Sequence, residues 1–154
     1  MTAASNPQST ERAHPIRPGK LDHVVLRVAD LSRAIDFYGD VLDCPVERRL
    51  DELGLVQLRA GDSLIDLVAI DSPLGKAGGG DVDPKGHNVD HFAIALRDFD
   101  EAAIREHLIH HGVEAGETGR RYGADGFGAS IYLQDPDGNT VELKAPAEGE
   151  VKAE

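Results

Sequence analysis

Four residues of metal-ligand type occupy matched positions in the two halves of this 154-residue sequence. Each half has a histidine in an apolar segment near its start (His23, His91) and a carboxylate in an apolar segment near its end (Asp66, Glu142). An isolated carboxylate in an apolar strand is costly to desolvate, and a shared divalent cation would offset that cost. Two imidazoles and two carboxylates suit Zn²⁺, Ni²⁺, Co²⁺, Mn²⁺ or Fe²⁺. The residues therefore predict one divalent metal ion as cofactor, able to polarise a bound oxygen.

Taken alone, each of the four residues has an ordinary structural explanation. A single strand histidine is commonly a hydrogen-bonded core residue, and Asp66 fits a hydrogen-bonded strand residue. Glu142 fits an exposed residue on the edge strand of a sheet. Recurrence of all four at matched positions favours the metal site over these separate explanations.

The elements that must position these residues repeat in the same order in both halves. In the first half, hydrophobic spacing predicts a strand, a helix and three strands, at 21–28, 31–42, 46–50, 55–60 and 63–70. The second half repeats this order at 89–96, 100–111, 113–118, 130–134 and 140–144. Its extra residues fall in the Gly-rich stretch 122–129, which is interpreted as a mobile lid. The prediction is an α+β fold of two βαβββ modules related by a pseudo-twofold axis.

Side-chain alternation gives each first strand one bulky face and one polar face. Val24, Leu26 and Val28 are expected to pack on a helix, which leaves His23 on the opposite face. The same alternation places further polar residues on the polar faces, where they are candidate substrate contacts together with Tyr122 of the Gly-rich stretch. These candidates are Arg27, Gln57, Arg59, Tyr132 and Lys144. Cationic residues there would hold an anionic substrate.

Composition restricts the partners and the compartment. The chain carries 28 acidic and 16 basic residues, a net charge of −12, which argues against nucleic acid or an anionic membrane as partner. No apolar run approaches the length of a bilayer span. Cys44 is the only cysteine, so an internal disulfide and a Cys-based zinc site are excluded. A cytoplasmic location is expected.

The ends of the chain differ in composition from its middle. Residues 1–20 lack the apolar core of a secretory signal and are expected to form a disordered tail. The acidic, Ala-rich end is expected to be disordered as well. The predicted organisation is a single domain at 21–145, comprising module one (21–70), a linker (71–88) and module two (89–145), followed by the tail 146–154.

Three segments resemble the vicinal oxygen chelate superfamily, which includes glyoxalase I, bleomycin- and fosfomycin-resistance proteins and extradiol dioxygenases: DHVVLRVADLSRAIDFYGDVL, VDHFAIAL and IYLQDPDGNTVELK. The resemblance implies an open, cup-shaped mixed sheet around a metal ion. His23, His91 and Glu142 match the family's two-His-one-Glu ligand set. Asp66 falls where glyoxalase I has a Glu, so it is a direct ligand, a ligand through water, or the catalytic base.

The resemblance implies several functions. The first is a metal-dependent lyase or isomerase that acts on a small oxygen-chelating substrate, such as a glutathione hemithioacetal. Asp66 or Glu142 would then move a proton between two carbons through an enediolate. The alternatives are an Fe(II) extradiol-type dioxygenase, with Tyr132 or Tyr122 as acid or base, and a metal-free ligand-binding protein of the bleomycin-resistance kind. The expected assembly is a homodimer, with the cup formed within one chain or across two.

Overall fold

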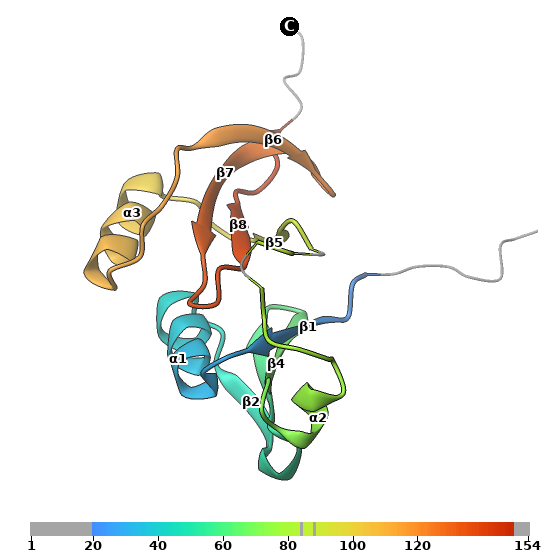
Figure 1. Cartoon of the computed structure of the whole chain (residues 1–154). Helices are drawn as coiled ribbons and strands as arrows, with labels where there is room; N and C mark the ends of the chain where they lie inside the picture. Colours follow the sequence, from blue (N-terminus) through green and yellow to red (C-terminus); the bar gives the residue numbers. More distant parts are fainter. Residues whose placement is uncertain (1–19, 84, 88, 150–154) are drawn as a thin grey trace, which may run out of the picture.

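Two four-stranded mixed sheets form the framework of the computed structural model, which describes residues 20–83, 85–87 and 89–149 (Figure 1). The strand order is β1-β4-β3-β2 in the first sheet and β5-β8-β7-β6 in the second, and neither sheet closes on itself. The α+β fold of two modules is therefore confirmed. The first sheet comprises β1 (His23–Val28), β2 (Val46–Leu50), β3 (Leu55–Ala60) and β4 (Ser63–Ala69). The second comprises β5 (Phe92–Ala95), β6 (Gly119–Gly123), β7 (Gly126–Gln134) and β8 (Thr140–Lys144).

Each module has one main helix, and an aspartate caps the N-terminus of that helix. Asp30 accepts a hydrogen bond from the Arg33 backbone NH at the start of α1 (Leu31–Asp36), which satisfies an otherwise unpaired helical donor. The helix then continues as a π-helical turn, Phe37–Val41, so the helix predicted at 31–42 is present with a wider last turn. Asp100 caps α3 (Glu101–His110) in the same way. The linker contains the short helix α2 (Pro73–Lys76). In the first module, the 3₁₀ turn Asp51–Leu53 precedes β3.

The pairing of strands places the first and last strand of each module side by side. β1 runs parallel to β4, with Val25 opposite Asp66. In the second module β5 runs parallel to β8, with Ala93 opposite Glu142. Because side chains alternate along a strand, each histidine lies near the carboxylate of its own module and on the same face of the sheet.

The second module departs from the sequence prediction at its second and third strands. Residues 113–118, predicted as a strand, form a loop with a single bridge between Ala115 and Leu133. The strand lies at β6 instead, paired with a β7 that begins at Gly126. The Gly-rich stretch is thus a β-hairpin, and its interpretation as a lid stays a prediction. Glycines lower strand propensity, but here the cross-strand ladder decides the structure.

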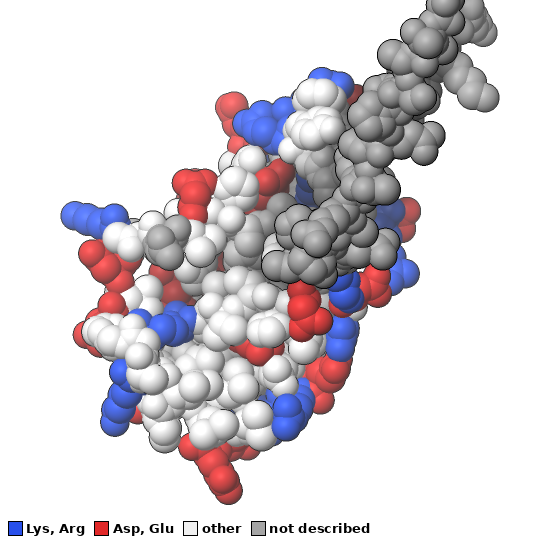
Figure 2. Space-filling model, turned by 90° about the vertical axis from the view of Figure 1, so that its right-hand side faces the viewer, with Lys and Arg blue, Asp and Glu red and all other residues white. Residues whose placement is uncertain are grey.

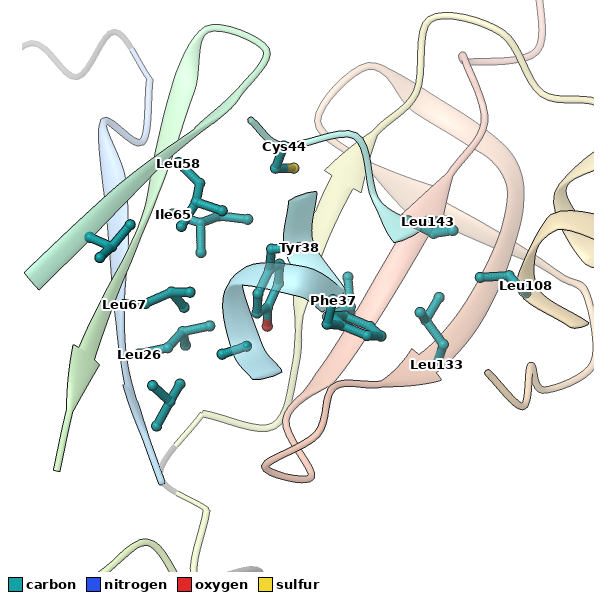
Figure 3. Packing of buried hydrophobic residues seen from close by; sticks show 14 residues of the cluster. Leu26, Phe37, Tyr38, Cys44, Leu58, Ile65, Leu67, Leu108, Leu133 and Leu143 are labelled. Carbon is teal, nitrogen blue, oxygen red and sulfur yellow. The ribbon is translucent and has the colours of Figure 1, made fainter. Parts of the chain in front are cut away.

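A common hydrophobic core joins the two modules. Leu26, Ile65 and Leu67 of the first sheet point towards α1, while Leu133 and Leu143 lie on the second sheet (Figure 3). Phe37 and Tyr38 of the helical segment lie between the two sheets in this view. The residues that alternate with this core, including Asp66 and Glu142, therefore belong to sheet faces turned away from it.

The ends of the described chain and its surface complete the description. Residues 146–149, predicted as part of a disordered tail, continue beside β7, where the Glu148 NH donates to the Phe127 carbonyl. The tail predicted at residues 1–20 lies outside the described residues except for Lys20, as do residues 150–154. On the face drawn in Figure 2, acidic and basic side chains are interspersed rather than separated. None of the helices in the described part of the chain is long and apolar enough to cross a membrane.

Candidate metal and substrate site

The second module brings a histidine and a buried carboxylate into contact. His91 Nε2 lies 3.1 Å from Glu142 Oε2, and Ser130 donates its hydroxyl proton to Glu142 Oε1. The Tyr132 ring meets the His91 ring edge-on, with centroids 5.4 Å apart. Each oxygen of Glu142 therefore contacts another side chain, and these two contacts hold the carboxylate in one orientation.

In the first module the corresponding carboxylate, Asp66, shares a sheet face with His23 and has one oxygen without a partner. Asp66 is 5% exposed, and its Oδ2 accepts a hydrogen bond of 2.9 Å from the Gln57 amide. Among the described residues, Asp66 Oδ1 is the one buried side-chain oxygen or nitrogen without a hydrogen-bond partner. Leaving such an oxygen buried and unpaired is costly.

An aspartate precedes each histidine and bonds to the same ring nitrogen. Asp22 Oδ2 lies 2.8 Å from His23 Nδ1, and Asp90 Oδ2 lies 2.7 Å from His91 Nδ1. A proton held on Nδ1 in this way orients Nε2 as the ligand nitrogen, which is the arrangement seen around metal-bound histidines; at His91 that nitrogen faces Glu142 Oε2. The hydrogen bond that His23 Nδ1 donates to Asp22 raises the pKa of His23 above its usual value. Desolvation opposes this rise, and the charge of Asp66 reinforces it.

Sequence reasoning did not assign Asp22, Asp90 or Ser130 to the site. The signal for the two aspartates was present, since the Asp-His dipeptide recurs in both halves. Ser130 had no comparable signal, because its role depends on its position beside β8 in the sheet.

The four predicted ligands form two pairs rather than one cluster. Across the residues that the structure describes, no three His, Cys, Asp or Glu side chains are grouped so that they could hold a metal ion. Each pair lies on the sheet face turned away from the common core. The metal ligand set predicted from sequence thus stays a prediction.

The donor chemistry of the two pairs nevertheless fits a divalent transition metal. Imidazole nitrogens oriented by carboxylates, a fixed glutamate and an aspartate oxygen without a partner are the donors that Zn²⁺, Ni²⁺, Mn²⁺ or Fe²⁺ accept. One pair alone supplies too few ligands for a protein-held catalytic metal, which has three protein ligands in typical sites.

The structure separates the predicted substrate contacts into two groups. Arg27 donates to the carbonyls of Gly75, Gly79 and Gly80 and so holds the linker in place. Arg59 forms two short hydrogen bonds to Glu47. Tyr122 pairs with Phe127 on the opposite face of its hairpin from Tyr132, and its side chain is exposed.

The remaining candidates lie at the two pairs. Gln57 contacts Asp66, as described. Tyr132 and Lys144 share the sheet face of Glu142, because Tyr132 is paired with Glu142 and Lys144 follows it by two positions on β8. Lys144 is buried, and its ammonium group donates to the Arg121 carbonyl at 3.0 Å.

Comparisons with known proteins agree with this fold. A catechol-2,3-dioxygenase of Bacillus subtilis is 29% identical over 128 residues, which are 81% of this chain and 41% of the relative. The chain thus spans less than half the length of this curated relative. An integron cassette protein from the V. cholerae mobile metagenome is 28% identical, with a TM-score of 0.64 over 84% of this chain and 97% of that one. A lactoylglutathione lyase structure from Agrobacterium tumefaciens is 22% identical, with a TM-score of 0.62 over 84% of this chain and 95% of that one.

The family comparison covers nearly all of the described residues. Residues 20–143 match the model of the glyoxalase/bleomycin resistance protein/dioxygenase superfamily. This span includes both Asp-His pairs, Asp66 and Glu142. The chain belongs to the glyoxalase/bleomycin resistance protein/dioxygenase superfamily.

Proposed function

We propose that the protein is a metal-dependent lyase or isomerase that acts on a small oxygen-chelating substrate, at a site completed by a second copy of the chain. The observation that carries the proposal is the unpaired, buried Oδ1 of Asp66. A buried carboxylate oxygen facing nothing is costly for folding alone. Such uncompensated groups are expected at functional sites, where a ligand or a proton supplies the missing partner.

A homodimer would bring the two ligand pairs together. In a twofold assembly, the first sheet of one chain faces the second sheet of its partner, and the reciprocal contact forms an equivalent site. Exposed apolar side chains at the edge strands support this arrangement, since Val25 on β1 and Val89 before β5 are more than half exposed in the single chain. Their burial between chains would stabilise the dimer.

The metal ion would be held by His23, His91 and Glu142, where it would polarise the substrate's adjacent oxygens and stabilise developing negative charge. Glu142 has both oxygens engaged, which suits a fixed ligand. Asp66 has one oxygen held by Gln57 and one free. Asp66 Oδ1 is therefore the better placed atom to take a proton from one substrate carbon and return it to the neighbouring one.

In this reaction the protein's own residues position and shield the substrate. The amide of Gln57 fixes the Asp66 carboxylate, so that its free oxygen faces a single direction. Burial of both carboxylates excludes water from the reacting atoms. A glutathione hemithioacetal, whose carbonyl and hydroxyl oxygens are adjacent, is a substrate of this type, and its rearrangement passes through an enediolate.

A second candidate function is an Fe(II) extradiol-type dioxygenase. The relative that favours it is the catechol-2,3-dioxygenase, at 29% identity. The required residues would be His23, His91 and Glu142, with Tyr132 beside His91 as the acid or base. A metal-free ligand-binding protein of the bleomycin-resistance kind is the remaining alternative, and the oriented histidines and the unpaired Asp66 oxygen count against it.

Metal binding and assembly are tested together by mixing two variants. His23→Ala and His91→Ala chains should each bind Ni²⁺ weakly in isothermal titration calorimetry. After unfolding and refolding as a mixture, half of the dimers should be mixed, each with one intact site, so about a quarter of the wild-type sites should return. If mixing restores no sites although dimers form in light scattering, the site does not lie between chains.

The reaction class is tested on the metal-loaded protein with two substrates. The lyase or isomerase proposal expects turnover of methylglyoxal plus glutathione, and loss of that turnover in Asp66→Asn with Ni²⁺ affinity largely retained. Turnover of catechol under O₂ by the Fe²⁺ form would favour the dioxygenase instead. Absence of Ni²⁺, Zn²⁺, Mn²⁺ and Fe²⁺ binding would exclude both enzymes.

A further inference from the structure

The Gly-rich hairpin of the second module carries two cationic side chains that the proposed reaction does not use. Arg121 on β6 is opposite Gly128 on β7, and Lys144 on β8 is opposite Ser130. Because paired residues share a sheet face and alternate residues return to it, Arg121 and Lys144 lie on the same face as Glu142. They are next to the His91–Glu142 pair, towards the β6 edge.

Three glycines on this face make room for the two cations. A Cβ atom at Gly119 would lie 2.6 Å from Arg121 Nη1, and one at Gly128 would lie 3.2 Å from Lys144 Nζ. A Cβ at Gly123 would overlap Lys144 Cε. We call Gly119, Gly123 and Gly128 the glycine bed. A larger residue at Gly119 or Gly123 would displace a cationic side chain, whereas one at Gly128 would first meet the backbone carbonyls of Pro146 and Ala145, at 2.9 and 3.1 Å, and then Lys144 Nζ.

Neither cation has a carboxylate partner within the described residues. Lys144 Nζ donates to the Arg121 carbonyl, and Arg121 Nη1 donates to the Arg120 carbonyl. The acidic groups that act on this region are already engaged. Glu148 forms three hydrogen bonds to Arg120, each of about 3 Å, and Glu142 is held by Ser130 and His91.

The two cations differ in exposure: Arg121 is exposed to solvent, whereas Lys144 is buried, and a buried positive charge is unfavourable without a counter-charge. Lys144 is only 9% exposed, and a lysine that buried is rarely left without an ionic partner. An oxyanion bound by both side chains would receive charge-assisted hydrogen bonds, which are among the strongest in proteins. The other candidate cations, Arg27 and Arg59, are already bonded to the linker carbonyls and to Glu47.

We propose that Arg121 and Lys144, lying on the glycine bed, form a subsite for an oxyanionic group of the ligand, a carboxylate or a phosphoryl group. The inference rests on the proposed small-molecule site and adds the class of its substrate. One end of the substrate carries the adjacent oxygens that lie at the His91–Glu142 pair, and the other end carries a negative charge. Tyr132 lies between these ends, because its ring contacts His91 and has the Arg121 guanidinium 5.9 Å from its centroid.

The subsite is tested on the full-length chain after removal of metal with EDTA, using inorganic phosphate and acetate as probes. Amide shifts in ¹H–¹⁵N spectra should saturate and should be confined to residues 119–123, 128–132 and 142–145, with chloride at equal ionic strength as the reference. The anion that saturates the shifts at the lower concentration shows whether the subsite prefers a phosphoryl group or a carboxylate. Shifts scattered over the surface, or no saturation with either anion, would overturn the proposal.

Matched variants separate the two cations from general surface charge. Arg121→Gln and Lys144→Met should each weaken the anion response about tenfold. Lys76→Gln removes the same charge from the exposed end of α2, outside the hairpin, and should leave the response within about twofold. Equal weakening in Lys76→Gln would show a non-specific charge effect and reject the subsite.

The glycine bed provides a test that leaves every charge in place. Gly123→Ala should displace the Lys144 side chain and weaken anion binding, whereas Gly80→Ala should not, because a Cβ at Gly80 meets no atom within 4 Å. Identical binding in both variants would contradict the role of the bed.

Ni²⁺ titration of the same samples distinguishes failure of this subsite from failure of the proposed function. Retained Ni²⁺ binding without a localised anion response rejects the subsite alone. A localised anion response without Ni²⁺ binding supports the subsite and rejects the metal-dependent reaction.

Discussion

Tyr38 and Asp135, which lie 97 positions apart in the sequence, share a buried hydrogen bond of 2.7 Å that joins the two modules. Tyr38 follows α1 in module one, and Asp135 begins the turn between β7 and β8 in module two. The carboxylate also accepts hydrogen bonds from the backbone NH groups of Asp137 and Asn139. Burial, together with the charge of Asp135, raises the pKa of Tyr38 far above its usual value, so the phenol stays a proton donor.

Removal of this hydroxyl should destabilise the fold. Tyr38→Phe leaves the Asp135 carboxylate with one fewer donor, and hydrogen bonds to charged groups contribute about 1.5–3 kcal/mol. The free energy of unfolding, measured by urea denaturation, should fall by about 2 kcal/mol. Tyr122→Phe is the matched control and should change it by less than about 0.5 kcal/mol, because that side chain is 74% exposed. Equal effects would show that the hydroxyl of Tyr38 does not tie the modules together.

Metal affinity should depend on His91 and not on the histidines of α3. His91→Ala removes a ligand beside Glu142 and should lower Ni²⁺ affinity on the order of a hundredfold or more. His107→Ala removes an imidazole bonded to the Val41 carbonyl, away from this pair. It should leave Ni²⁺ affinity unchanged in calorimetry. If the two variants lose affinity alike, His91 is not a ligand.

The two aspartates that precede the histidines should tune metal binding without contacting the metal. Asp90→Asn and Asp22→Asn weaken the acceptor at His91 or His23 Nδ1, and such changes typically cost 10–100-fold in metal affinity. Calorimetry with Ni²⁺ should show this loss, and ¹⁵N spectra of the metal-free protein should show a mixture of ring tautomers. Asp71→Asn, at an exposed turn outside the site, is the control. Unchanged tautomers with unchanged affinity would reject the orienting role.

Cys44 should be unreactive in the folded protein. Its side chain is buried, and burial raises the pKa of the thiol to about 11. At about pH 8 roughly one thiol in a thousand is then ionised, and only the thiolate reacts with alkylating agents. Iodoacetamide should modify the urea-unfolded chain fully and the native chain negligibly, as measured by mass spectrometry.

The same shift predicts a loss of stability in alkali. The thiol of the unfolded chain ionises near 9.0, before that of the folded chain. Its contribution to stability is therefore present below pH 9 and is lost as the pH rises to about 11. A Cys44→Ala variant should lack this component of the alkaline decline in urea unfolding. Rapid alkylation of native Cys44 would contradict its burial.

Local chemistry made the first module the more predictable half. The alternation of β1, the nearly continuous apolar run of β4 and the Asp30 cap of α1 are properties of adjacent residues. The strand predicted at 113–118 is wrong because the actual strand, β6, has the sequence GRRYG, which carries no alternating apolar signal. Its identity as a strand depends on hydrogen bonds to β7.

The sequence by itself determined the repeated βαβββ order and the His and carboxylate pairs, because periodicity and recurrence are visible in one dimension. Only the tertiary structure decided that Glu142 is fully engaged while Asp66 keeps one free oxygen. It also assigned Arg27 and Arg59 to internal contacts and left Arg121 and Lys144 on the glycine bed. These assignments depend on which strand neighbours which, and strand neighbours are fixed by long-range pairing and packing rather than by local residue preference.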